Sequence, residues 1–245
     1  SVPEIEAFFD HDSNTVSYVV TDIAMKKAAI IDSVLDFDYA SGTVSYGHAD
    51  TIIDYVTMQN LDVEWLIETH VHADHLSAAP YIQQKLGGKI GISNRISEVQ
   101  SVFGKTFNAG TEFERDGSQF DHLFADGDRY KIGKLDGVAI ATPGHTPACM
   151  VHLIGDAMFV GDTLFMPDGG TARADFPGGD ARTLYQSIQK ILAQPDETRI
   201  FVCHDYAPNG REFLWETTVG AQRANNIHVG NNVSEESFVE MREKR

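Results

Sequence analysis

Polar residues of the types that bind metals recur in this chain directly after short apolar runs. The stretch ETHVHADH (68–75) follows the run VEWLI, and PGHTPAC (143–149), GDT (161–163) and CHDY (203–206) each end a later apolar run. Strand ends that lead into polar loops are where an α/β scaffold usually carries its chemistry. The pattern predicts a chain of mixed helices and strands whose chemistry lies at the strand ends.

Hydrophobic periodicity predicts strands and helices in alternation. Leu184, Ile188 and Leu192 share one face of a helix that Asp180 would cap. A Gly-Asp pair between MVHLI and AMFV is typical of a hairpin turn. The segment 36–50 is rich in Asp, Gly and Ser and is expected to be a loop. The predicted strands are 14–20, 27–32, 65–69, 89–93, 137–142, the hairpin 150–160 and 199–206, and the predicted helices are 49–60, 76–88, 180–195 and the tail from 234.

Composition narrows the class of protein. The chain has 245 residues and a formal net charge of −17, which argues against broad binding to nucleic acid or to anionic lipid. No apolar run approaches the roughly 18 residues of a membrane span, and no signal peptide is visible, so we expect no membrane association. The two cysteines, Cys149 and Cys203, cannot form a disulfide scaffold. They favour a reducing compartment, and we expect a cytoplasmic protein.

The cluster at 70–75 has the composition of a metal site. His70 and His72 are two positions apart in an extended segment, so their side chains project the same way. Asp74 and His75 follow about one turn later. Neutral imidazoles and a carboxylate suit zinc or iron. A complete site would need distant ligands, and the candidates are His145, Asp162 and His204.

The remaining histidines are expected to be structural, since an isolated histidine is more often a surface or core residue than a ligand. They are His11, His48, His122, His152 and His228.

THVHADH, TPGHT, GDT and CHDY, in this order, resemble the motifs of the metallo-β-lactamase superfamily. The resemblance covers roughly residues 5 to 228. It implies an α+β fold, a four-layer αββα metallo-β-lactamase sandwich formed by residues 1–245 as a single domain. It also implies a metal site at the open edge between the two sheets.

AIATPGHTPACMVHLIGDAMFVGDTLF, GGTARADF and DARTLYQSI resemble more closely the persulfide dioxygenases, also called sulfur dioxygenases or ETHE-like proteins. That resemblance implies oxidation of glutathione persulfide by O2 and water to sulfite and glutathione. It implies one Fe(II) per chain, with zinc as an alternative or substitute, held by His70, His145 and Asp162. It also suggests a homodimer or higher oligomer. Four further residues would surround this iron or hold a second metal: His72, Asp74, His75 and His204.

Two other functions stay open. A thioester hydrolase of the glyoxalase II type (a hydroxyacylglutathione hydrolase) would use the complete set of ligands for two metals. That family usually carries Lys and Tyr where this chain has Arg173 and Asp175. A non-catalytic metal or persulfide sensor is the third possibility. Arg173 and Arg211 are candidates for substrate binding, because an anionic substrate needs local positive charge in an acidic protein. Tyr206 is a third candidate, since the resemblance aligns it with a position that contacts the thiol substrate in glyoxalase II relatives.

Overall fold

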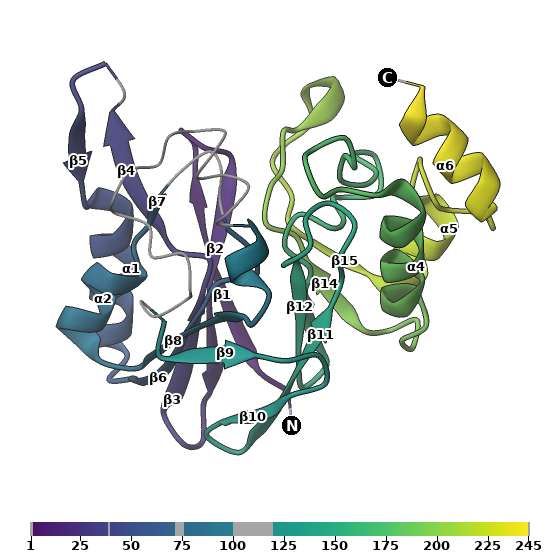
Figure 1. The fold of residues 1–245 in the computed structure, drawn as a ribbon. Helices are drawn as coiled ribbons and strands as arrows, with labels where there is room; N and C mark the ends of the chain where they lie inside the picture. Colours follow the sequence, from purple (N-terminus) through teal and green to yellow (C-terminus); the bar gives the residue numbers. More distant parts are fainter. Residues whose placement is uncertain (1, 39, 72–75, 100–119, 245) are drawn as a thin grey trace.

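The computed structural model describes residues 2–38, 40–71, 76–99 and 120–244, which form two facing β-sheets with helices on both outer sides (Figure 1). The first sheet has the order β1-β2-β3-β6-β8-β9 and the second the order β10-β11-β12-β13-β14-β15. The fold is the predicted four-layer αββα sandwich.

The strands of the first sheet are β1 (Glu4–Asp10), β2 (Thr15–Asp22), β3 (Lys27–Ile31), β6 (Asp62–Ile67), β8 (Lys89–Ser93) and β9 (His122–Phe124). Those of the second are β10 (Arg129–Ile132), β11 (Leu135–Ala141), β12 (Met150–Ile154), β13 (Ala157–Phe159), β14 (Arg199–Phe201) and β15 (Glu216–Thr218). The helices are α1 (Gly47–Met58), α2 (Ala79–Leu86), α4 (Ala181–Leu192), α5 (Val219–Asn225) and α6 (Glu235–Glu243), with a 3₁₀ turn, η1 (Pro208–Gly210).

Three apolar clusters separate the four layers. One lies between the sheets and joins Val16 and Ile31 of the first sheet to Met150 and Phe159 of the second. Another packs α1 and α2 onto the outer face of the first sheet. The third packs α4, α5 and α6 onto the outer face of the second. Each sheet is therefore covered on both faces, as its apolar strands require.

Local signals explain most elements. Asp180 accepts a hydrogen bond from the backbone N–H of Thr183 at 2.9 Å and caps α4 as predicted. Leu184, Ile188 and Leu192 of α4 are buried, as their spacing requires. The predicted hairpin is the antiparallel pair β12–β13, and the predicted tail helix is α6.

The segment 36–50 is not a plain loop, and that expectation was wrong. It holds the end of β4 (Val34–Asp38), all of β5 (Thr43–Ser45) and the start of α1. β4 pairs with β5 on one side and with β7 (Leu76–Ser77) on the other. The pairing with β7 is a long-range contact that the composition of the segment does not reveal.

The directions of the strands bring the polar motifs together. β11 and β13 both run antiparallel to β12, and β14 runs parallel to β13. The carboxyl ends of β11, β13 and β14 therefore lie at one edge of the second sheet, and the end of β6 faces them from the first. In the part of the chain that the structure describes, no helix has the length and apolar character needed to cross a bilayer.

Candidate metal centre

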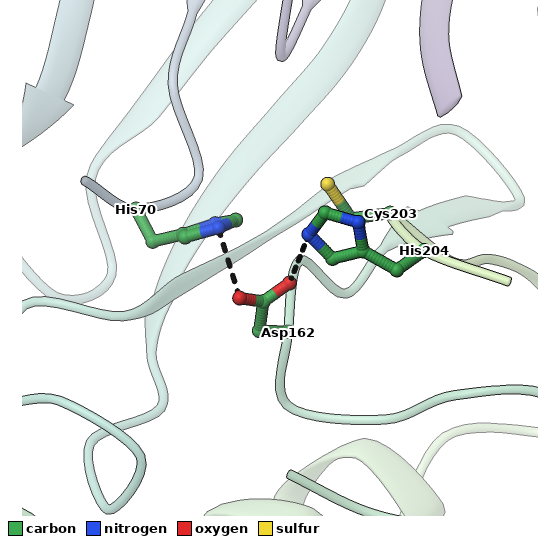
Figure 2. A group of neighbouring side chains, drawn as sticks. All are labelled: His70, Asp162, Cys203 and His204. Atoms are coloured by element: carbon green, nitrogen blue, oxygen red, sulfur yellow. Dashed lines mark ion pairs between the residues drawn. The ribbon is translucent and has the colours of Figure 1, made fainter. Parts of the chain in front are cut away.

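The carboxylate of Asp162 lies at the centre of the polar edge, just after β13. Its Oδ2 atom is 3.1 Å from Nε2 of His70 and 3.7 Å from Nε2 of His145. Its Oδ1 atom is 3.0 Å from Nε2 of His204 (Figure 2). Atoms that share a metal ion at about 2.0–2.2 Å lie roughly 3 Å apart, so these separations suit ligation. One oxygen of Asp162 therefore faces His70 and His145, and the other faces His204.

His70 is oriented by a buried hydrogen-bond chain. The Thr69 hydroxyl donates to Oδ2 of Asp32 at 2.7 Å and lies 2.7 Å from Nδ1 of His70. Because the hydroxyl proton is given to the carboxylate, the hydroxyl oxygen accepts the Nδ1–H of His70. The lone pair of Nε2 then points toward Asp162. Asp32 is itself fixed, since its Oδ1 accepts the backbone N–H of Thr69 at 2.8 Å.

His145 is oriented by a backbone carbonyl. Its Nδ1 lies 2.6 Å from the carbonyl oxygen of Arg173. A carbonyl can only accept, so Nδ1 carries the proton and Nε2 keeps its lone pair. Gly144 makes the turn before it, with φ of 136°. A Cβ at this position would lie 2.3 Å from the Cα of Leu184, so α4 can approach the turn only because residue 144 is glycine.

His204 follows the same rule. Its Nδ1 lies 3.2 Å from the carbonyl oxygen of Asn14 and 3.3 Å from Oγ1 of Thr15. Three histidines from separate elements thus each have an outward Nδ1–H and an Nε2 lone pair turned toward Asp162. This shared tautomer is the arrangement that metal-ligating imidazoles adopt, and it shows that the residues present fit a metal ion.

The electrostatics of Asp162 agree with this assignment. Burial alone would raise the pKa of its carboxyl, but without a metal ion the imidazoles of His70 and His204, when they also carry a proton on Nε2, hold that pKa well below its ordinary value. A bound cation would supply the same positive charge and leave each Nε2 lone pair free for ligation. The carboxylate is therefore ionised and available as a ligand. The thiol of Cys203 belongs to the same group: one ligand atom from each of His70, Asp162, Cys203 and His204 lies within 4.8 Å of the others (Figure 2).

The structure thus brings together four of the predicted site residues: His70, His145, Asp162 and His204. The other three from the first motif, His72, Asp74 and His75, lie outside the described residues.

The three predicted substrate-binding residues lie in different environments. Arg173 forms a bidentate pair with Asp175, at 3.0 and 2.6 Å, beside the exposed ring of Phe176. Tyr206 is 60% exposed, and its ring lies nearly parallel to that of His204 at 6.1 Å. Both therefore border the centre, and their role in substrate binding stays a prediction.

Arg211 is committed to other partners. Its five N–H groups bond to the carboxylates of Asp168 and Asp205 and to the carbonyl oxygen of Glu212. A substrate carboxylate could bind there only by displacing one of these groups. The geometry favours a structural role for Arg211, and substrate binding by it stays a prediction.

Sequence reasoning missed Asp32 and Thr69. Asp32 is 3% exposed and follows the apolar strand β3 with φ of 54°, in the left-handed region. A carboxylate directly after a buried strand is the signal that could have identified it.

Three histidines turned toward one ionised carboxylate, at the open edge of an αββα sandwich, define a class of metal-dependent enzymes. The sequence profile of the metallo-β-lactamase superfamily matches residues 12–204. The chain belongs to this superfamily. Its donor set of imidazoles and a carboxylate suits zinc and iron alike.

Individual relatives differ in the activity that their names state. A probable metallo-hydrolase of Burkholderia pseudomallei is 51% identical, over 98% of this chain and 85% of its own length. Glyoxylase B2 of Dictyostelium discoideum is 44% identical, over 99% of this chain and 84% of its own. The mitochondrial persulfide dioxygenase ETHE1 of Bos taurus is 28% identical, over 98% of this chain and 80% of its own.

One solved structure extends the comparison. The crystal structure of ETHE1 from Myxococcus xanthus superposes with a TM-score of 0.76 at 28% identity, covering 98% of this chain and 90% of that one. The chain spans only 56% of the length of other relatives, the beta-lactamase hydrolase-like proteins of Xylella fastidiosa and Agrobacterium fabrum.

Proposed function

We propose that this chain is a metal-dependent enzyme that acts on a group bound to the sulfur of a small thiol such as glutathione. One observation carries the proposal: three inward Nε2 atoms surround the ionised carboxylate of Asp162. A metal ion bound here would supply Lewis-acid activation of water or, in the case of iron, redox chemistry with O2.

The chain's own residues define two sides of the centre. His70, His145 and Oδ2 of Asp162 would hold an ion on one side, and His204 with Oδ1 would face the other. Thr69 keeps His70 in the tautomer that ligation needs. The aromatic rings at the rim, Phe176 beside His145 and Tyr206 beside His204, offer apolar surface for a thiol-bound substrate.

Hydrolysis of a glutathione thioester is the reaction that similarity of sequence supports better, since the relative named Glyoxylase B2 is 44% identical. The two-sided carboxylate supports it too, because a carboxylate that can bridge two ions suits a binuclear hydrolytic centre. In this reaction an activated water would attack the thioester carbonyl and release the thiol.

Oxidation of glutathione persulfide is the second candidate, and a different observation favours it. His70 and His145 both face the same oxygen of Asp162, which is the two-histidine, one-carboxylate set of mononuclear iron oxygenases. The similarity to ETHE1 in fold and sequence also supports it. One O2 and one water would then convert the outer sulfur to sulfite, with glutathione as the other product.

Metal content and two assays distinguish the reactions. The chain would be loaded with Fe(II) under anaerobic conditions or with zinc, and metal per chain would be measured. Cleavage of S-lactoylglutathione without O2 uptake would establish the hydrolase. O2 uptake on glutathione persulfide, matched by sulfite, would establish the dioxygenase. Fully loaded protein that does neither would overturn the proposal.

A further inference from the structure

The segment 170–173 crosses the rim of the metal centre without belonging to a strand or helix, yet its backbone is held at nearly every position. The side-chain amide of Asn226 donates to the carbonyl oxygen of Gly170 at 3.1 Å. The backbone N–H of Thr171 donates to Nδ1 of His228 at 2.9 Å, and the guanidinium of Arg242 donates to the carbonyl oxygen of Thr171 at 3.2 Å. Side chains of Asn226, His228 and Arg242, of which the first and last are buried, therefore fix this segment.

The packing around these contacts is tight. Gly170 has φ of 80°, and a Cβ there would lie 2.1 Å from Nδ1 of His228, so the imidazole lies directly against the glycine backbone. Thr171 is 3% exposed and Arg242 is 6% exposed. A guanidinium is rarely buried to this extent, because desolvating a charge is costly unless the charge is well hydrogen-bonded. The guanidinium of Arg242 is stabilised there by the carbonyl oxygen of Thr171 and the ring of His228.

The far end of the same segment reaches the metal centre. The carbonyl oxygen of Arg173, two residues beyond Thr171, accepts the Nδ1–H of His145 at 2.6 Å. The position of this carbonyl sets the orientation of the His145 ring. Ala172, between Thr171 and Arg173, donates its N–H to the carbonyl oxygen of Thr163 at 3.4 Å. Thr163 directly follows Asp162.

We infer that Arg242 of α6 is a positioning residue for His145, which it controls through the backbone of residues 171–173. α6 lies on the outer side of the second sheet (Figure 1), and Arg242 reaches inward from it to the Thr171 carbonyl. The inference rests on the proposed metal centre. It assigns to the C-terminal helix a role in setting the affinity of that centre.

The contacts also predict which side of the metal centre is affected when Arg242 is replaced. Without Arg242, the Thr171 carbonyl loses its donor and the segment can shift, which lengthens the bond between Arg173 and His145. Residues that orient metal-bound histidines typically change metal affinity about 10–100-fold. His204 is oriented by Asn14 and Thr15 at the other end of the site, so its side of the centre should be unaffected.

The test compares variants at two positions of α6, Arg242 and Glu236, which differ in what they contact. Arg242→Met removes the donor to Thr171, and Arg242→Lys keeps a positive donor at the same position. Glu236→Gln is the matched control, because Glu236 pairs with Arg182 on the exposed side of the helix and does not contact the segment. His228→Leu removes the acceptor for the Thr171 N–H. It also removes a ring that Arg242 contacts, so it perturbs the same segment from a second residue.

Co(II) affinity would be measured by competition with a chromophoric chelator, together with the visible Co(II) spectrum, on protein without substrate. We expect Arg242→Met and His228→Leu to lower affinity at least tenfold and to change the spectrum. Arg242→Lys should restore affinity to within about threefold, and Glu236→Gln should match the wild type.

Wild-type affinity in Arg242→Met, or an equal loss in Glu236→Gln, would overturn the inference. If Arg242→Met does not fold, Arg242→Lys and His228→Leu still decide it: wild-type affinity and spectrum in His228→Leu would overturn it. Since metal binding is measured without turnover, failure of the proposed function would leave this result unchanged.

Discussion

The Thr69 hydroxyl offers the sharpest test of how the metal centre is built. Thr69→Val keeps the shape of the side chain and removes only the oxygen between Asp32 and His70. The Nδ1–H of His70 then loses the hydrogen bond to Thr69, and Oδ2 of Asp32 loses the hydrogen bond from Thr69. Thr69 is 1% exposed, so water cannot readily replace the hydroxyl.

The expected magnitude follows from these two lost hydrogen bonds. A buried polar group left without its partner costs about 1–3 kcal/mol, so the free energy of unfolding of the metal-free protein should fall by roughly 2 kcal/mol. Because the tautomer of His70 is no longer fixed, zinc affinity should fall about 10–100-fold. That loss corresponds to roughly 1.4–2.7 kcal/mol of binding free energy.

The assay is zinc competition with a chromophoric chelator, combined with urea unfolding of the metal-free protein. Thr69→Ser is the control, since it keeps the hydroxyl and should bind zinc within about threefold of the wild type. If Thr69→Val binds zinc as tightly as Thr69→Ser, the hydroxyl does not orient His70 and the reasoning fails.

Three other predictions concern the framework around the site. Gly144→Ala should destabilise the fold by about 3 kcal/mol or more and weaken metal binding, because the new Cβ would collide with the backbone of Leu184. A melting temperature within a degree or two of the wild type would contradict this prediction. Burial lowers the pKa of His152 to about 4. The folded state favours the neutral ring. The contribution of His152 to the free energy of unfolding is therefore complete above the unfolded pKa of about 6.5. It is lost as pH falls toward 4, a decrease of about 3 kcal/mol. Urea unfolding of the metal-free protein at pH 7 and pH 4.5 should show this loss, and His152→Gln, which cannot titrate, should reduce it. Burial raises the pKa of the Cys149 thiol to about 12, so iodoacetamide at pH 8 should leave Cys149 unmodified in the folded protein and modify it after unfolding, as mass spectrometry would show.

The sequence alone was sufficient to predict those elements that local interactions determine. The cap at Asp180 and the spacing of Leu184 and Ile188 predict α4, and the Gly-Asp turn predicts the β12–β13 hairpin. His70, His145, Asp162 and His204 were identified because each follows an apolar strand. The superfamily resemblance then supplied the layering of the two sheets, which periodicity alone does not reveal.

What the sequence could not supply depends on contacts between distant residues. β4 and β5 form because β4 also pairs with β7, and the polar residues between 36 and 50 concealed them. Arg242 lies in a polar tail, and nothing near it in the chain indicates that its guanidinium is buried against Thr171. Arg211 was considered for substrate binding from its charge, but only the folded structure shows the carboxylates that engage it.

The ligand residues come from both sheets of the sandwich, so metal binding affects the stability of the protein. His70 extends from the first sheet, whereas His145, Asp162 and His204 extend from the second. An ion bound among them would cross-link two layers that otherwise meet through apolar packing and a few seam hydrogen bonds. Each tenfold excess of free metal over the dissociation constant would add about 1.4 kcal/mol to the stability of the fold. Scarcity of the metal would then expose the chain to proteases, so metal supply would set the amount of protein as well as its activity.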